Sequence, residues 1–312
     1  AHRGATAEAA RVVASGGGGT GSGAGVALAA EGSCAGSCGI DGRLRIWDVS
    51  PTDVKERIAS TRPGVELETV VFHPELPGVV LGGIQQGNAL VWFWDYQEEA
   101  FYDWGAFSTS LSRGVGAACF SGDGKMFAAG VGSFVITWKS SGKVATGRTV
   151  VKGHTSPVRT LAFSPDRKLL ASGGDGKNSR VWTFGWLGAS MKIKLKGHTD
   201  TLTTIDFSPN GQYLASGSHD RSVLVWDLAN PSEKPMLTLT GHTGGVRLLK
   251  FGPDPSRLIS ISESGQLISW ELPSGNRLNE IAFDVGGLAT SLAVSQDLSK
   301  MAVGGLDGRV SF

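Results

Sequence analysis

Cysteine is scarce in this chain of 312 residues, which contains only Cys34, Cys38 and Cys119. Three thiols cannot all pair with one another, and so few in a chain of this length argue against a fold built on disulfides. We therefore expect a reducing, cytoplasmic location, with the thiols buried as small apolar groups.

Long apolar runs and an excess of charge of one sign are also lacking. No stretch approaches about 18 continuous apolar residues, and no charged segment followed by an apolar one opens the chain, so we expect no membrane insertion. The 29 basic and 28 acidic residues give a net charge of +1, which offers no global reason to bind nucleic acid. A charged partner must therefore bind a local patch.

Tryptophan recurs at a nearly constant interval. Steps of 45, 46, 44, 44 and 44 residues, and a last step of 42, separate Trp47, Trp92, Trp138, Trp182, Trp226, Trp270 and Phe312. Such a period is typical of stacked units that cannot bury their apolar faces alone, so we interpret residues 1–312 as a single repeat domain. Because the chain begins without methionine and stops within a repeat, we expect a piece of a longer, multi-domain protein or complex.

The repeat is clearest between Gly197 and Asp227. Its apolar pieces are short, rich in β-branched and aromatic residues, and bounded by turn formers such as Pro209-Asn210-Gly211. These features predict consecutive antiparallel strands joined by tight turns. The same turn recurs in phase with the tryptophans, beginning at Phe72, Phe120, Phe163, Phe251 and Val294.

This pattern resembles the WD-repeat family of β-propellers, in which Gly-His opens each repeat and Trp-Asp closes it. The opening dipeptide is matched by Gly153-His154, Gly197-His198 and Gly241-His242, and the closing one by Trp47-Asp48 and Trp226-Asp227. In the second repeat either Trp92 or Trp94-Asp95 fits the closing position.

The resemblance implies an all-β, seven-bladed WD40 β-propeller with four-stranded antiparallel blades. Its last blade is incomplete unless residues near Ala1 supply the fourth strand. The glycine-rich run at about 16–25 is interpreted as a flexible insertion. A phosphate-binding loop is the alternative, but no Gly-Lys-Ser/Thr follows.

The resemblance also implies a buried hydrogen-bonded chain in the repeats, running from the tryptophan nitrogen through Ser and His to Asp. Its expected members are Trp226, Ser216, His198 and Asp220 in the fifth repeat, Trp182, Ser172, His154 and Asp175 in the fourth, and Trp270, Ser260 and His242 in the sixth. We expect only the fifth to be complete. A catalytic Ser-His-Asp triad is the alternative, but repetition of the set favours a structural role.

The pair Cys34-x-x-x-Cys38 could be either part of a zinc site or two buried thiols. The pair lacks the second pair of ligands that a zinc site needs, so we predict no metal and no cofactor.

Two segments offer candidate partner contacts. Lys192, Lys194 and Lys196 alternate with apolar residues, which predicts an outer strand with three lysines on one face. They either prevent edge-to-edge pairing or bind an acidic partner such as an acidic peptide or tubulin. Aromatic residues among acidic ones, at Tyr96, Phe101, Tyr102 and Trp104, form either an interface hot spot or a cover for a neighbouring blade.

In WD-repeat proteins generally, ligands often bind where the loops meet one end of the central channel. Carried onto this chain, that surface includes Glu68, Arg159, Thr203, His219, Arg221 and Arg247. Either arginine could bind a carboxylate or phosphate with two hydrogen bonds, and Glu68 could neutralise one of them.

These observations favour a non-catalytic scaffold for protein binding. Three alternatives stay open: a microtubule-linked propeller of the cytoskeleton, cilium or centriole, a substrate receptor of a ubiquitin ligase, and a propeller enzyme. Ligase receptors of that sort usually carry Arg two residues beyond Trp-Asp, where this chain has Ser50 and Ala229. An enzyme would need a base and a nucleophile together at the channel, and none is evident.

Overall fold

The computed structural model describes residues 11–13, 25–29, 33–39, 41–50, 54–108, 114–185, 188–282, 289–294, 301–305 and 309–311. These ranges contain strands, turns and loops, and none of their residues is helical. They accordingly hold no helix with the length and apolarity of a membrane span.

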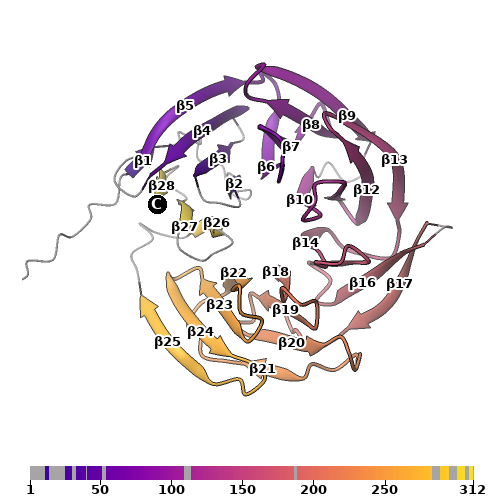
Figure 1. The fold of residues 1–312 in the computed structure, drawn as a ribbon, viewed down its shortest axis with the longest axis vertical. Coiled ribbons are helices and arrows are strands. Elements are labelled where there is room, and N and C mark those ends of the chain that lie inside the picture. Colours follow the sequence, from indigo (N-terminus) through magenta and orange to yellow (C-terminus); the bar gives the residue numbers. More distant parts are fainter. Residues whose placement is uncertain are drawn as a thin grey trace, which may run out of the picture.

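The described strands form seven four-stranded antiparallel sheets, or blades, arranged in a ring (Figure 1). Blade 1 contains β2 (Gly25–Leu28), β3 (Cys34–Cys38), β4 (Arg43–Val49) and β5 (Val54–Thr61). Blade 2 contains β6 (Glu66–Phe72), β7 (Gly78–Gln85), β8 (Asn88–Asp95) and β9 (Ala100–Ser108). Blade 3 contains β10 (Val115–Phe120), β11 (Met126–Val131), β12 (Phe134–Ser141) and β13 (Val144–Val151).

The next three blades repeat this order from the inside outward. Blade 4 contains β14 (Val158–Phe163), β15 (Leu169–Gly174), β16 (Ser179–Gly185) and β17 (Gly188–Leu195). Blade 5 contains β18 (Leu202–Phe207), β19 (Tyr213–Ser218), β20 (Val223–Asp227) and β21 (Leu237–Leu239). Blade 6 contains β22 (Val246–Phe251), β23 (Arg257–Ser262), β24 (Gln266–Glu271) and β25 (Arg277–Ala282).

The remaining sheet joins the two ends of the chain. It contains β26 (Ala289–Val294), β27 (Met301–Gly305), β28 (Arg309–Ser311) and, as its outer strand, β1 (Arg11–Val13). Arg11 pairs with Ser311 and Val13 with Arg309, so a segment near the N-terminus supplies the strand that the C-terminal repeat lacks. The expected glycine-rich insertion at about 16–25 lies outside the described residues, apart from Gly25 at the start of β2.

The apolar core lies between neighbouring blades. Trp104 and Phe93 of blade 2 belong to the same buried cluster as Phe127 and Trp138 of blade 3. Equivalent clusters join blades 1 and 2, 3 and 4, 4 and 5, and 5 and 6. This arrangement explains the tryptophan period, because each blade completes its burial against the next one.

Strand register decides which tryptophan closes the second repeat. In blade 2, Trp94 and Phe72 both pair with Val79 of β7, and Phe72 begins the Phe-His-Pro turn. In blade 4, Trp182 and Phe163 likewise both pair with Leu170 of β15. Trp94-Asp95 therefore holds the closing position, and Trp92 lies two residues before it.

Candidate functional site

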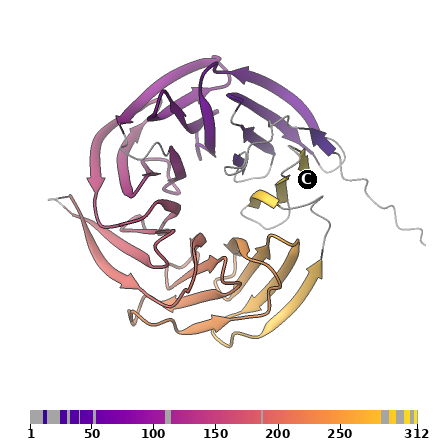
Figure 2. The same cartoon turned by 180° about the vertical axis from the view of Figure 1, so that it is seen from behind.

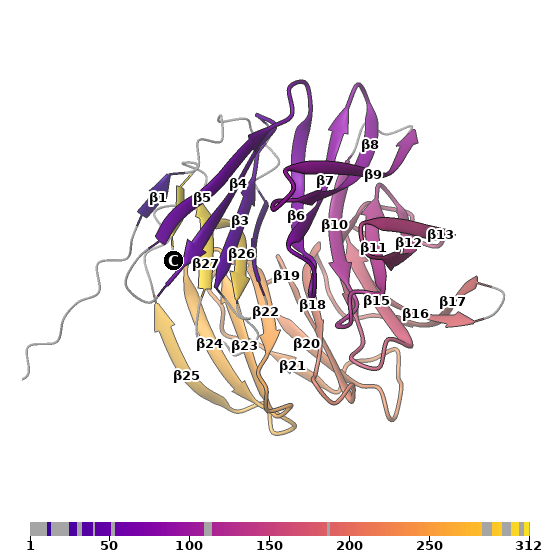
Figure 3. The same ribbon diagram turned by 45° about the horizontal axis from the view of Figure 1, so that its top comes forward.

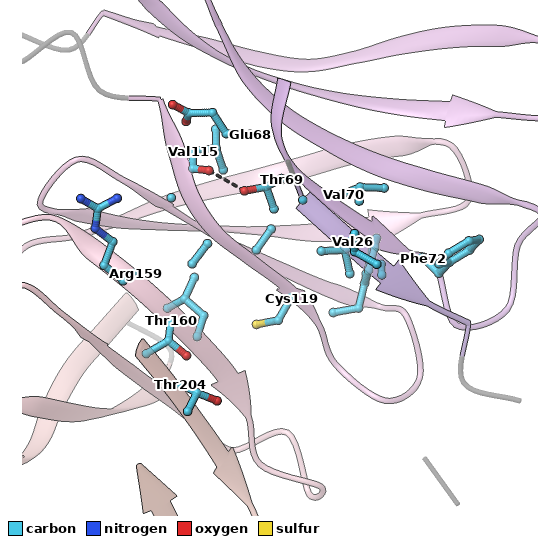
Figure 4. Close-up of a pocket in the computed structure, with 18 of the residues that line it drawn as sticks. Val26, Glu68, Thr69, Val70, Phe72, Val115, Cys119, Arg159, Thr160 and Thr204 are labelled. Atoms are coloured by element: carbon cyan, nitrogen blue, oxygen red, sulfur yellow. Dashed lines mark hydrogen bonds between the residues drawn. The ribbon is translucent and has the colours of Figure 1, made fainter. Parts of the chain in front are cut away.

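The inner strands surround a central cavity of about 1770 Å³. Its wall comes from β2, β6, β10, β14, β18 and β22 with the loops at their ends, and these strands face the centre of the ring in both axial views (Figure 1, Figure 2). Residues more than a hundred positions apart in the sequence, such as Glu68 and Thr204, therefore face one space (Figure 4).

A one-residue bulge recurs on the inner strands. In β14 the ladder skips Arg159, because Val158 pairs with Gly174 and Thr160 with Gly173. A bulge leaves its residue out of the ladder and redirects the side chain. The residues skipped in this way are Glu68, Gly116, Arg159, Thr203, Arg247 and Thr290.

These bulges define the channel mouth, a surface formed by Glu68, Arg159, Thr203, Arg247 and the turn residue His219. All five line the cavity, and the repeat places the bulged residues at the same end of it. The structure thus brings together five of the six residues expected at this end from the sequence. The sixth, Arg221, is an exposed residue in the turn between β19 and β20, with φ of 69°.

The two arginines of the channel mouth already have acidic partners within the chain. Nε of Arg159 lies 3.0 Å from a carboxylate oxygen of Asp175. Nε of Arg247 lies 3.7 Å from Glu263, which also approaches His219 at 3.8 Å. Acidic residues of neighbouring turns thus take the place that was expected for Glu68.

Thr203 is engaged in joining blades. Its hydroxyl donates to the carbonyl oxygen of Val246 in blade 6, at 2.5 Å. Thr69 donates in the same way to Val115 of blade 3, at 2.6 Å (Figure 4). A hydroxyl held by a carbonyl of the next blade stabilises the ring, so Thr203 is a poor partner contact.

The buried polar chain takes a different form in each of three blades. In blade 5, His198 lies 2.9 Å from Ser216 through Nε2 and 2.9 Å from Asp220 through Nδ1. The indole nitrogen of Trp226, however, has no hydrogen-bond partner. The expectation that the fifth repeat holds the complete chain is wrong at that link.

Blade 4 contains the link that blade 5 lacks. Trp182 donates to Ser172 at 2.7 Å, and Ser172 lies 2.6 Å from Nε2 of His154. Nδ1 of His154 faces Arg180 at 2.6 Å, not Asp175, which pairs with Arg159. The proposed role of Asp175 in this chain is therefore wrong, because its carboxylate turns to the channel mouth.

Blade 6 keeps the inner half of the chain. Trp270 donates to Ser260 at 2.8 Å, and His242 Nε2 lies 2.6 Å from the same oxygen. No acidic residue completes it, and Nδ1 of His242 is buried without a partner.

Burial sets the protonation of these histidines. It lowers the pKa of His154 to about 3, helped by the positive charge of Arg180, and it lowers the pKa of His242 to about 4. Burial alone would raise the pKa of Asp220, but hydrogen bonds from His198, Ser222 and the Thr199 backbone outweigh it and hold that pKa well below its usual range. His154 and His242 are therefore neutral structural groups at neutral pH.

These same three repeats match a family model, that of the WD domain, G-beta repeat, over residues 146–183, 189–227 and 233–271. Those ranges end at or just after the tryptophans of the polar chains. Three of the seven blades, blades 4 to 6, thus match the WD-repeat family.

Several curated WD-repeat proteins are similar to part of the chain. WD repeat-containing protein 1 of Mus musculus is 30% identical over 142 residues, which cover 46% of this chain and 23% of that protein. Meiotic recombination protein rec14 of Schizosaccharomyces pombe is 41% identical over 58 residues, 16% of this chain and 19% of the relative. WD repeat and HMG-box DNA-binding protein 1 of Xenopus laevis is 26% identical over 146 residues, which cover 47% of this chain and 12% of that protein. The chain spans less than a quarter of each of these three relatives.

The aromatic segment packs at its end against a neighbouring blade. Trp104 is only 6% exposed, stacks on Phe93 with ring centroids 5.7 Å apart, and donates to the backbone of Lys143 at 2.9 Å. Phe101 stacks on Trp94 at 5.9 Å, and the hydroxyl of Tyr102 donates to Glu98 at 2.9 Å.

At Trp104 the structure supports the second of the two interpretations, the cover for a neighbouring blade, because the ring packs against Phe120 and Phe127 of blade 3. Tyr96, half-buried, packs edge-on against Trp94 at 6.3 Å. Trp104 in particular is wrong as an interface residue, because blade 3 already buries its ring.

The lysine segment forms the outer strand of blade 4, as expected, in a hairpin that extends away from the ring (Figure 3). A bulge interrupts its alternation, because Val181 pairs with Ile193 and Trp182 with Met191, so the ladder skips Lys192. Lys194 is half-buried, and Lys196 pairs with Glu233 at 2.6 Å. The prediction of three lysines on one face therefore fails at Lys192, which the bulge takes out of the alternation.

The cysteines are free thiols. Cys34 and Cys38 lie on β3, fully inside blade 1, and burial raises the pKa of Cys38 to about 12. Within the described ranges no group of three or more His, Cys, Asp or Glu side chains has the arrangement of a metal site.

Arg180 is the polar residue that sequence reasoning missed. It is 8% exposed and occupies the position two residues before the closing tryptophan. The equivalent residues of blades 2, 3, 5 and 6 are Trp92, Ile136, Leu224 and Ile268. Aligning the repeats on their tryptophans would have revealed two arginines, Arg45 and Arg180, at a position that is apolar and buried in blades 2, 3, 5 and 6.

Proposed function

We propose that this chain is a rigid, non-catalytic platform for protein binding and that the channel mouth is its main docking surface. The observation that carries the proposal is the repeated bulge, which directs Glu68, Arg159 and Arg247 to one end of the channel. Loop and bulge residues held by a stiff sheet scaffold are well placed to bind partners. The WD-repeat match of blades 4 to 6 supports the same general role.

The ion pairs at the channel mouth favour recognition over chemistry. Asp175 and Glu263 hold Arg159 and Arg247 in fixed orientations, so less side-chain entropy is lost when a partner binds. The histidine of the mouth, His219, faces Glu263, and no hydrogen bond joins it to a hydroxyl or thiol of the described residues, as acyl transfer would require. The proposal also includes a cytoplasmic location and a propeller that is one domain of a longer chain.

Quantitative affinity capture from cells tests the platform. The double variant R159A/R247A should lose proteins that the wild-type chain retains. The matched control K125A/K168A removes two exposed charges from turns at the other end of the inner strands, where the side chains are 74% and 80% exposed. If R159A/R247A recovers the same proteins as wild type while both variants keep the wild-type melting temperature, the channel mouth is not the docking surface.

A microtubule-linked propeller is the second candidate, and the exposed outer strand with Lys192 favours it. The triple variant K192E/K194E/K196E should then abolish co-sedimentation with microtubules, because tubulin tails are acidic. Retained co-sedimentation of the triple variant would exclude the lysine strand as the contact. Failure of the wild-type chain to co-sediment would dispose of this candidate and with it a cytoskeletal, ciliary or centriolar location. Nothing in the described residues favours the ubiquitin-ligase hypothesis.

A further inference from the structure

The chain is close to neutral, but its charges are segregated around the ring. Residues 125–197 carry 13 lysines and arginines and two acidic residues, Asp166 and Asp175. The remaining residues carry 16 basic and 26 acidic side chains. Blade 4 and the greater part of blade 3 therefore form a basic sector in an otherwise acidic molecule.

Part of this positive charge is neutralised within the chain. Asp95, Asp123, Asp175 and Glu233 form ion pairs with Lys143, Arg167, Arg159 and Lys196. Four other cations on the outer side of blade 4 have no carboxylate within salt-bridge distance among the described residues. We call this set the basic wall: Lys152, Arg180, Lys192 and Lys194.

The basic wall lies where the outer strands of two blades meet. Lys152 follows β13, and Lys192 and Lys194 are on β17, the next outer strand around the ring (Figure 1). Arg180 lies behind β17, opposite Lys194 in the ladder. Two residues after Lys152, His154 accepts a hydrogen bond from Arg180, which joins the loop after β13 to β16.

The hydrogen bond to His154 explains only part of the position of Arg180, because it leaves the positive charge of the guanidinium without an anion. Like charges directly opposite one another destabilise a sheet, and burying an arginine without an anion is costly. Burial accordingly lowers the pKa of Arg180, and no acidic group opposes that effect. The equivalent arginine of blade 1, Arg45, has a carboxylate in Glu56 at 3.7 Å.

The chain itself shows how an acidic segment binds at the end of this strand. The backbone N–H of Lys196 donates to the carbonyl oxygen of Glu233 at 2.8 Å, and the ammonium group of Lys196 lies 2.6 Å from the Glu233 carboxylate. One residue of the loop between β20 and β21 thus supplies both a backbone acceptor and a side-chain anion. The basic wall continues this surface along β17.

We propose that the basic wall is a docking surface for an acidic, extended protein segment, which pairs along the outer edge of β17 and places a carboxylate at Arg180. The pairing of Glu233 favours a peptide over a nucleic acid, since only a peptide offers a backbone carbonyl and a carboxylate on the same residue. Met191, 51% exposed beside Lys192, adds an apolar contact for such a segment. The inference deepens the scaffold function proposed above but does not depend on the channel mouth.

Fluorescence anisotropy with a labelled 12-residue oligo-glutamate peptide tests the proposal. The wild-type chain should bind the peptide, with affinity that falls as salt is raised. K192E/K194E should weaken binding about tenfold or more. The matched control K55E/K234E makes the same change of net charge on exposed lysines of blades 1 and 5 and should bind within about twofold of wild type.

Arg180→Gln tests the buried anchor. Glutamine keeps a hydrogen-bond donor for His154 and removes the charge, so the melting temperature should not fall while peptide binding weakens about fivefold or more. Unchanged binding by either K192E/K194E or R180Q overturns the proposal, as does an equal loss in K55E/K234E.

Three further outcomes would also overturn the proposal, because they would show a different occupant of the basic wall or a different site for the peptide. Tighter binding of a labelled oligo-dT than of the peptide, with the same variant dependence, would identify nucleic acid as the occupant. Concentration-dependent self-association lost in K192E/K194E would identify a second copy. R159A/R247A should bind the peptide as wild type does, and its failure would place the peptide at the channel mouth instead.

Discussion

Arg180 donates a hydrogen bond to Nδ1 of His154 over 2.6 Å, whereas in the next blade Nδ1 of His198 lies 2.9 Å from the carboxylate of Asp220. A guanidinium can only donate, and a carboxylate can only accept. The neutral His154 therefore carries its proton on Nε2 and donates toward Ser172, whereas His198 carries a proton on Nδ1 and donates toward Asp220. Equivalent residues of neighbouring repeats thus form hydrogen-bonded chains of opposite direction.

Replacing His198 by Ala should lower the free energy of unfolding by about 2–3 kcal/mol, because Ser216 and Asp220 lose their buried partner. Urea denaturation followed by tryptophan fluorescence measures the change. His219→Ala, at the half-exposed channel mouth, should cost well under half as much. Equal stability of the two variants would mean that the buried chain does not support the blade.

The free energy of unfolding should fall as the pH is lowered from about 7 to about 5. The pKa values of His154 and His242, about 3 and about 4, lie below the 6.5 of an unperturbed histidine. Between these values the unfolded chain binds protons that the folded chain does not, so acid favours unfolding. Urea titrations at three pH values measure the slope, and the double variant H154Q/H242Q should flatten it. A wild-type profile without slope would show that these histidines are protonated in the folded chain.

Trp104→Ala should destabilise the chain by about 3–5 kcal/mol, since it leaves a cavity between blades 2 and 3. Thermal and urea denaturation measure the loss. Met191→Ala, at a side chain that is 51% exposed, is the control and should change stability by less than about 0.5 kcal/mol. A mild effect of Trp104→Ala would return this residue to the candidates for partner binding.

Two glycines of one turn should respond differently to alanine. Gly124 has φ of 65°, and a Cβ there would lie 2.6 Å from the ring of His73 in blade 2, whereas a Cβ at Gly122 would meet nothing within 4 Å. We expect Gly124→Ala to cost more than about 1 kcal/mol and Gly122→Ala to be nearly neutral. Differential scanning calorimetry of the two variants provides the comparison, and similar melting temperatures would contradict the close packing of His73.

The all-β repeat architecture was predictable because its signals are local and recur. The turn at Pro209-Asn210-Gly211 and the short β-branched segments around it specify strands within a few residues, and the tryptophan period multiplies that signal. Register was less accessible. The choice between Trp92 and Trp94 depended on which residue each one pairs with on the neighbouring strand. That register cannot be read directly from the sequence.

The candidate sites were predicted in outline and corrected in detail. Arg159 and Arg247 do face the channel, but their partners, Asp175 and Glu263, could be assigned only once the turns were placed side by side. The sequence could not distinguish an interface hot spot from a cover for a neighbouring blade in the aromatic segment. Contact with blade 3 decided between them at Trp104.

The sequence by itself determined the repeat, the strands and the positions of the polar residues within each blade, because backbone preferences and periodic burial act over short distances. Only the tertiary structure decided which of those polar residues are partners. The bulge at Lys192, the pairing of Arg180 with His154 and the missing acceptor of Trp226 all depend on contacts between segments separated along the chain. Hydrogen bonds and ion pairs need atoms within a few ångströms, and only packing brings such atoms together.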